Sequence, residues 1–224
     1  MVVYDSQTFH VLLLRHGQTD ANATGVLQGH QPTPLNALGL AQAQRLAARV
    51  ARHVPRVTAV VSSDLRRAAQ TAGPVAAACG LTATFDPAWR ERGFGEFEGK
   101  HVGERATWRA AHGDTDPPGA ESLAHFRARV RGAVESLPAG LGRRHRAVAL
   151  VTHGGPGGVV LRLLADGTLP SAPGSAPTEV VNAANCSVME LLADPVAGGG
   201  HVWRVACVND VAHLDGLVSD ADSG

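Results

Sequence analysis

Short apolar runs alternate along the chain with longer stretches in which apolar residues recur at helical spacing. The runs that predict strands are 9–14, 57–61, 81–85, 147–152, 187–192 and 201–208. The stretches that predict helices are 36–53, a segment beginning near residue 65, 121–137 and 157–165. Continuous apolar strands are typical of parallel sheets that are covered on both faces. The pattern therefore predicts an α/β fold, a three-layer sandwich with a mostly parallel central sheet and helices on both faces.

Local signals add detail to this pattern. Ser62, Ser63 and Asp64 are residue types that cap helices, and they follow a predicted strand. Gly73-Pro74 predicts a kink or a division of the helix that begins near residue 65. Residues 86–120 show no regular pattern, and residues 166–178 are typical of a loop. The glycines at 198–200 predict that the last two strands form an antiparallel pair.

Length and composition narrow the class of protein. A chain of 224 residues suits a single domain over 1–224, with a small acidic tail at 215–224 that we expect to be flexible. The formal net charge is zero, which gives no indication of a nucleic-acid partner or an anionic membrane surface. Neither a signal peptide nor an apolar stretch of about 18 residues is present, so we expect a cytoplasmic protein. The oligomeric state is left open.

The cysteines give no indication of a metal or disulfide framework. Cys79, Cys186 and Cys207 are far apart and odd in number, and no CxxC pair occurs. The histidines likewise show no paired spacing such as HExxH. We therefore expect no metal site.

Polar residues suited to phosphate follow three of the predicted strands, at 15–17, 62–64 and 152–154. Because the carboxyl ends of parallel strands meet at one edge of a sheet, we expect these three segments to converge. A guanidinium group matches phosphate oxygens with a planar fork, and the neutral imidazole of a histidine can attack phosphorus. The sequence therefore predicts a phosphate-handling site at this edge.

Five motifs in this order resemble those of the histidine phosphatase superfamily, the phosphoglycerate-mutase-like proteins. The resemblance spans most of the chain, and each motif falls at the boundary of a predicted element. The matching segments are RHGQTDAN at 15–22, LQG at 27–29 with Pro34-Leu35, Gly39 and Gln42-Ala43 after it, SSDLRRAAQTA at 62–72, RERGFGEFEG at 90–99 and VTHGG at 151–155.

The resemblance implies a role for each matching residue. His16 becomes transiently phosphorylated, while Glu91 protonates the leaving oxygen and then takes a proton from the attacking water. The residues implied to hold the phosphoryl group are Arg15, Arg67, His153, Asn22, Thr19, Gln28, Gly29 and Gly154. No metal and no organic cofactor is implied, because the arginines and His153 supply the positive charge. The family fold also implies that one strand of the sheet runs opposite to the others.

Several neighbouring residues receive simpler interpretations. Arg66 and Arg67 are adjacent on a predicted helix and cannot both point inward, so we interpret Arg66 as a solvated charge. Glu96 and Glu98 are interpreted as solvated loop residues. Gly17 is expected to leave room for the substrate and for a sharp turn.

The resemblance leaves three functions open. A phosphatase for small-molecule phosphate monoesters is favoured, since only about 30 residues separate Glu91 from the segment 119–122. A cofactor-dependent phosphoglycerate mutase would carry a longer insertion there, which encloses the substrate and excludes water. A catalytically silent phosphate-binding module is the alternative of another class. A small phosphate ester is the only partner that the sequence predicts, and its alcohol is not identified.

Two positions depart from the family pattern. Pro32 stands where the family often has an acidic residue, and the segment 156–158, Pro-Gly-Gly, replaces bulky aliphatic residues. Both changes are expected near the pocket, where they would alter its width or the rigidity of a loop.

Overall fold

The computed structural model describes residues 7–113, 115–142, 144–174 and 183–217. The end of the tail at 218–224, which the sequence predicts to be flexible, and the last part of the loop predicted at 166–178 lie outside the described residues.

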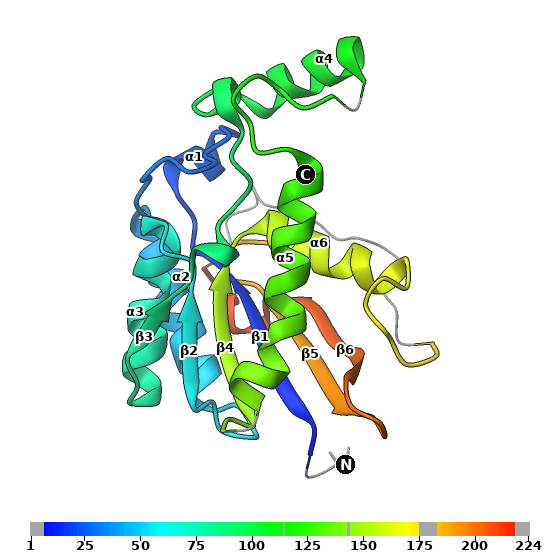
Figure 1. The fold of residues 1–224 in the computed structure, drawn as a ribbon. Coiled ribbons are helices and arrows are strands. Elements are labelled where there is room, and N and C mark those ends of the chain that lie inside the picture. The colour runs from blue at the N-terminus through cyan, green and yellow to red at the C-terminus, as the bar shows by residue number, and fades with distance from the viewer. Residues whose placement is uncertain (1–6, 114, 143, 175–182, 218–224) are drawn as a thin grey trace.

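A six-stranded sheet forms the centre of the molecule (Figure 1). Its strands are β1 (Phe9–Arg15), β2 (Ala59–Ser62), β3 (Ala83–Phe85), β4 (Ala147–Thr152), β5 (Val188–Pro195) and β6 (His201–Asp210). In space they follow the order β3-β2-β4-β1-β5-β6. The pairs β3–β2, β2–β4 and β4–β1 are parallel, whereas β5 runs antiparallel to both β1 and β6. The prediction of a mostly parallel sheet with one opposing strand is confirmed.

Helices cover both faces of this sheet, as the strand pattern predicts. Helices α2 (Ala37–Ala51) and α3 (Arg66–Cys79) lie on one face, and α5 (Leu123–Leu137) and α6 (Gly154–Ala165) lie on the other (Figure 1). The shorter elements are α1 (Asp20–Ala23), α4 (Val102–His112), single 3₁₀ turns η1 (Pro87–Trp89), η2 (Gly95–Phe97) and η4 (Ala212–Leu214), and a π turn η3 (Pro138–Gly142).

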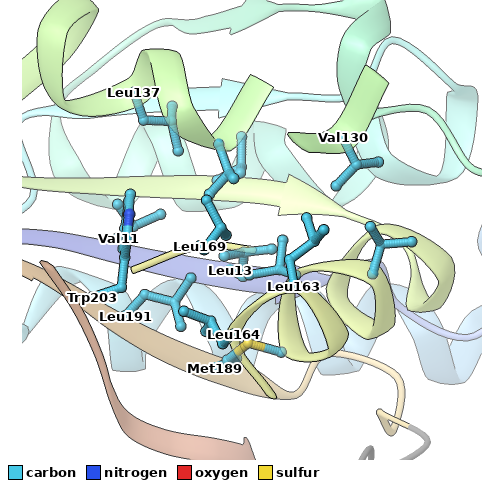
Figure 2. Packing of buried hydrophobic residues seen from close by; sticks show 14 of the residues in the cluster. Val11, Leu13, Val130, Leu137, Leu163, Leu164, Leu169, Met189, Leu191 and Trp203 are labelled. Carbon is cyan, nitrogen blue, oxygen red and sulfur yellow. The ribbon is translucent and has the colours of Figure 1, made fainter. Parts of the chain in front are cut away.

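Strand β1 belongs to two hydrophobic cores at once. Val11 and Leu13 pack with residues of α5 and α6, while Leu12 and Leu14 pack with residues of α2 and α3. Successive side chains of a strand point to opposite faces, so a continuous apolar run supplies both cores. Figure 2 shows the first core, in which Val11 and Leu13 lie among side chains of the other strands and of the covering helices. Burying one such aliphatic side chain contributes roughly 1.5–3 kcal/mol, so the end of β1 is held rigidly.

Helix α3 differs from the sequence prediction at two points. It is not divided at Gly73-Pro74 and continues through Pro74, because buried residues on both sides of the proline, from Thr71 to Cys79, hold it against α2 and the sheet. The N-cap is Leu65 rather than a residue of 62–64, and no side chain caps the helix. Ser63 still serves the entry to the helix, since its Oγ accepts the Leu65 N–H at 3.3 Å.

Helix α4 lies within the stretch 86–120 that the sequence predicts to be irregular. It has no buried residue and stands beyond the edge of the sheet formed by the carboxyl ends of the parallel strands (Figure 1). A capping box stabilises it locally: His101 Nδ1 accepts the Gly103 N–H, and Glu104 Oε1 accepts the His101 N–H. A search for apolar periodicity could not find this helix, because almost no core-facing side chains mark it.

A buried polar cluster, His10, His53 and Glu190, lies at the other end of β1. Glu190 Oε1 accepts from His10 Nδ1 at 2.8 Å and from His53 Nε2 at 3.0 Å. His53 Nδ1 donates to the Pro55 carbonyl at 2.7 Å, so both nitrogens of this ring face acceptors. The ligand atoms of the three side chains lie within 4.8 Å of one another, which would also suit a metal ion. In the described structure, the Glu190 carboxylate is held by hydrogen bonds from the two histidines.

This cluster makes the stability depend on pH. Burial alone would raise the pKa of Glu190, but the hydrogen bonds from His10 and His53 lower the pKa from 4.5 to about 2. The stabilisation is therefore present above pH 4.5 and is lost as the pH falls toward 2. We expect Glu190→Gln to lower the free energy of unfolding by roughly 2 kcal/mol near pH 7 and by much less near pH 3.

Urea unfolding at a series of pH values measures this difference. Glu135→Gln serves as the control, because Glu135 forms an exposed pair with Arg131 and should cost at most about 1 kcal/mol at any pH. An equal loss for Glu190→Gln at pH 3 and pH 7 would contradict the linkage.

Candidate active site

The ends of β1, β4 and β2 lie side by side and bring three polar segments together, as predicted. Arg15 is in register with Thr152, and Ser62 is in register with Val151. A pocket of about 330 Å³ opens over these ends. Of the predicted site residues, it is lined by Arg15, His16, Asn22, Gln28, Gly29, Arg67, Glu91 and Gly154.

The imidazole of His16 is held in one tautomer. Its Nδ1 lies 2.7 Å from the Gly17 carbonyl oxygen, which can only accept, so Nδ1 carries the proton. Its Nε2 lies 3.2 Å from Arg67 Nε, which can only donate, so Nε2 carries the lone pair. The ring is 3% exposed and lines the pocket. His16 therefore presents an unprotonated nitrogen beside a guanidinium group.

Two arginines supply positive charge around this nitrogen. Arg67 is almost completely buried, and its terminal nitrogens donate to the carbonyls of Gly29 and Gln31. Arg15 extends from the end of β1 and donates to the Ala183 carbonyl. These hydrogen bonds to backbone carbonyls fix the orientation of both guanidinium groups. Little side-chain entropy therefore remains to be lost when an anion binds. Arg66, in contrast, is exposed, as the sequence analysis expects.

His153 is the second histidine of the site and is packed against the first. The two ring centroids are 5.1 Å apart, and His153 is 2% exposed. Its Nε2 lies 2.9 Å from Ser63 Oγ, while its buried Nδ1 has no hydrogen-bond partner in the described structure. The sequence predicts Ser63 only as a helix cap. Its role in orienting His153 could be found only from the fold.

Both histidines are held neutral. Burial, followed by the charges of Arg67 and Arg15, lowers the pKa of His16 well below 6.5. Burial and the charge of Arg67 likewise lower the pKa of His153. A positive charge on either ring would be desolvated and repelled, so the site stays neutral at these positions until an anion arrives.

Glu91 faces the pocket across from these cations. Its Oε2 accepts the Gly155 N–H at 2.9 Å, and its Oε1 accepts the Arg92 N–H at 2.8 Å. Gly155 leaves the space for this carboxylate, because a Cβ at that position would lie 1.9 Å from Glu91 Oε1. The first turn of α6 thus positions an acidic group at the pocket.

Asn22 lines the pocket, whereas Thr19 lies beneath it. Thr19 caps helix α1 and donates its hydroxyl to Asn22 Oδ1, which leaves the Asn22 amide nitrogen available to a ligand. Asn185 Nδ2 donates to the His16 carbonyl and to Asn22 Oδ1. Asn185 comes from the segment before β5, and no motif in the sequence analysis marks it. The expected phosphate contact of Thr19 stays a prediction.

Glu98 is a structural residue rather than a solvated one. Its Oε1 accepts the N–H groups of His30 and Phe94, both at 3.0 Å. A Cβ on Gly29 would collide with this carboxylate, at 1.9 Å from Oε1. Glu98 therefore ties the loop that carries Gln28 and Gly29 to the loop that follows Glu91. Glu96 is exposed, as expected.

Other expectations about the pocket are corrected by the geometry. The space beside Gly17 is taken by protein rather than by substrate, since a Cβ there would lie 2.5 Å from the Gly39 carbonyl oxygen. Pro32 is exposed, and neither it nor Gly157-Gly158 lines the described pockets around Glu91. The two departures from the family pattern therefore lie outside the walls of these two pockets.

The geometry agrees with the comparisons to known proteins. The chain belongs to the histidine phosphatase superfamily, whose branch 1 matches residues 11–206. Among curated proteins it is similar to the probable phosphoglycerate mutase GpmB of Yersinia enterocolitica, with 35% identity over 92% of this chain and 94% of that protein.

Solved structures share the fold. A mycobacterial glucosyl-3-phosphoglycerate phosphatase is 29% identical with a TM-score of 0.72, over 90% of this chain and 99% of that chain. A phosphoglycerate mutase from Bacillus anthracis is similar in fold alone, with 21% identity and a TM-score of 0.76 over 95% and 98% of the two chains. None of the helices in the described part of the chain is long and apolar enough to cross a membrane.

The lowered pKa of His16 predicts that its ring stays neutral in mildly acidic solution. Ring-nitrogen NMR of the free protein should show an unprotonated Nε2 and a protonated Nδ1 below pH 6.5. Arg67→Gln should move the titration midpoint upward, because it removes a positive charge next to the ring. A midpoint at or above 6.5 in the unaltered protein would contradict this account.

The contact between Gly155 and Glu91 predicts a selective loss of activity. In Gly155→Ala the new methyl group must displace the Glu91 carboxylate, which can swing away without unfolding the protein. We expect kcat for phosphoryl transfer to fall about 100-fold, as for a misplaced catalytic group. We expect little change in the thermal midpoint. Gly157→Ala is the control, since its Cβ would lie 3.6 Å from Met189 Cε in ordinary contact. Equal activities of the two variants would show that Glu91 is not positioned in this way.

Proposed function

We propose that the protein is a phosphatase that hydrolyses small-molecule phosphate monoesters through a phosphohistidine on His16. The observation that carries this proposal is the tautomer of His16, with its Nε2 lone pair at the pocket beside Arg67. A neutral imidazole is a nucleophile toward phosphorus, and phosphoryl transfer needs little more than in-line positioning and stabilised oxygens.

In the first step, the phosphoryl oxygens take over the N–H groups of Arg67 and Arg15 and the amide of Asn22. His16 Nε2 forms a bond to phosphorus as the ester P–O bond breaks, and Glu91 gives its proton to the departing oxygen. The proton stays on His16 Nδ1, hydrogen-bonded to the Gly17 carbonyl oxygen, so the ring develops positive charge that this hydrogen bond stabilises. His153, oriented by Ser63, donates to a phosphoryl oxygen.

In the second step, water attacks the phosphohistidine from the side that the alcohol has left. Glu91 takes a proton from this water, the P–N bond breaks, and His16 returns to its neutral form. Inorganic phosphate is released. The two arginines provide the charge that a metal ion supplies in other phosphatases, so we propose that no metal is needed.

The same residues would serve a phosphoglycerate mutase, and the names of the relatives include both activities. The shape of the site supports the phosphatase. Glu91 lies where two pockets meet, since it lines both the pocket over His16 and a second cavity of about 550 Å³. Water therefore has room to reach the phosphohistidine beside Glu91, and hydrolysis should exceed transfer to a second alcohol.

Phosphate release from a panel of phosphate monoesters, measured with excess EDTA, tests this proposal. We expect turnover that His16→Ala lowers at least about 1,000-fold, because it removes the nucleophile. His125→Ala, a change of an exposed histidine on α5, serves as the control and should keep full turnover.

Two outcomes would overturn the proposal. Interconversion of 2- and 3-phosphoglycerate that is faster than phosphate release would show a mutase. Turnover of the whole panel no faster than that of His16→Ala would show a phosphate-binding module.

A further inference from the structure

A second cavity of about 550 Å³ adjoins the pocket over His16. The two spaces share Glu91, Phe94 and Gly155 in their walls. In the proposed reaction Glu91 protonates the leaving oxygen, so the alcohol part of the ester must extend past Glu91. The second cavity lies where that part of the substrate would be held.

Arginines from three helices line this cavity. Arg105 and Arg109 are one turn apart on α4, Arg127 lies in the first turns of α5, and Arg162 belongs to α6. Arg162 lies on the same face of α6 as Gly155, seven positions earlier in the chain. The helix that positions Glu91 therefore also places Arg162 in the wall of the second cavity. We call these four residues the arginine set.

Little negative charge balances Arg105, Arg127 and Arg162 in the described structure. Of the two acidic residues in the cavity wall, Asp116 pairs with Arg92, and the Glu91 carboxylate accepts two backbone N–H groups. No ion pair in the described part of the chain involves Arg105, Arg127 or Arg162. The exposed carboxylate of Asp166, near Arg127, accepts the N–H of Thr168.

Arg105 is the member of the arginine set whose charge is most affected by burial and by neighbouring arginines. Its guanidinium group stacks over Phe94, and its buried Nε has no hydrogen-bond partner in the described structure. Burial and the charges of Arg92 and Arg109 lower the pKa of Arg105, and the charge of Glu91 offsets part of this effect. An anion in the cavity would reduce this repulsion, since guanidinium groups bind carboxylates and phosphates in a fork.

We propose that the cavity binds a second anionic group, a carboxylate or a phosphate, carried by the alcohol part of the substrate. This inference rests on the proposed function, because it assigns the alcohol to the side of Glu91 that faces the arginine set. The protein then selects phosphate esters whose leaving alcohol is itself negatively charged over neutral esters of the same size.

A matched series of aryl phosphates tests this selectivity. The ring carries a carbamoylmethyl, a carboxymethyl or a phosphonomethyl group, so the members differ in charge at nearly constant size. Because Arg109, Arg127 and Arg162 are exposed, we expect kcat/KM to be about 3- to 5-fold higher for a charged member than for the neutral one. The two charged members distinguish a carboxylate site from a phosphate site.

Substitution of arginines in the cavity wall tests whether this selectivity arises in the cavity. Arg127→Gln and Arg162→Gln should each lower the ratio of kcat/KM for the preferred charged ester to that for the neutral ester, by about 2- to 3-fold. Arg131→Gln is the control, because Arg131 lies one turn further along α5 and pairs with the exposed Glu135. It should leave the ratio unchanged.

Binding of the corresponding non-hydrolysable benzylphosphonates, measured by calorimetry, separates this proposal from the proposed function. Tighter binding of a charged analogue that depends on Arg162 would support the anion site even if no ester is hydrolysed. Hydrolysis of all three esters with equal kcat/KM, or an unchanged ratio in Arg127→Gln and Arg162→Gln, would overturn the anion site and leave the phosphatase proposal in place.

Discussion

The hydrogen bond from His16 Nδ1 to the Gly17 carbonyl is the interaction on which the site depends. It fixes the proton on one nitrogen and leaves the other as a lone pair beside Arg67. Burial among two arginines keeps the ring neutral, which preserves a nucleophile and makes the site attractive to a dianion. The rest of the fold serves to hold this geometry. β1 is anchored in two cores, α3 carries Arg67, and α6 brings the Gly155 N–H to Glu91.

Much of this arrangement could be predicted from the sequence. Apolar runs identified the strands because both faces of the sheet are buried, and the positions of Arg15, His16 and His153 just after strands predicted their convergence. Motif order added Arg67 and Glu91. Apolar runs and motifs are each formed by residues close together in the chain, so they can be recognised in a single sequence.

The features that could not be predicted depend on contacts between distant segments. Asn185 and Ser63 act through hydrogen bonds to site residues more than 80 positions away in the chain. Pro74 is accommodated because packing on both sides outweighs one missing backbone bond, and α4 is held by its caps rather than by a core. Gly17 marks a close approach of two backbones that only the tertiary structure shows.

The central claim is that His16 Nε2 attacks phosphorus in line with the leaving oxygen, which Glu91 protonates. A crystal structure with bound orthovanadate tests it most directly, because vanadate adopts the five-coordinate geometry of phosphoryl transfer. The account predicts a bond from vanadium to His16 Nε2, with the opposite apical oxygen at Glu91 and the equatorial oxygens at Arg15, Arg67 and His153. Vanadate bound elsewhere, or bound in the pocket without a bond to His16, would contradict it.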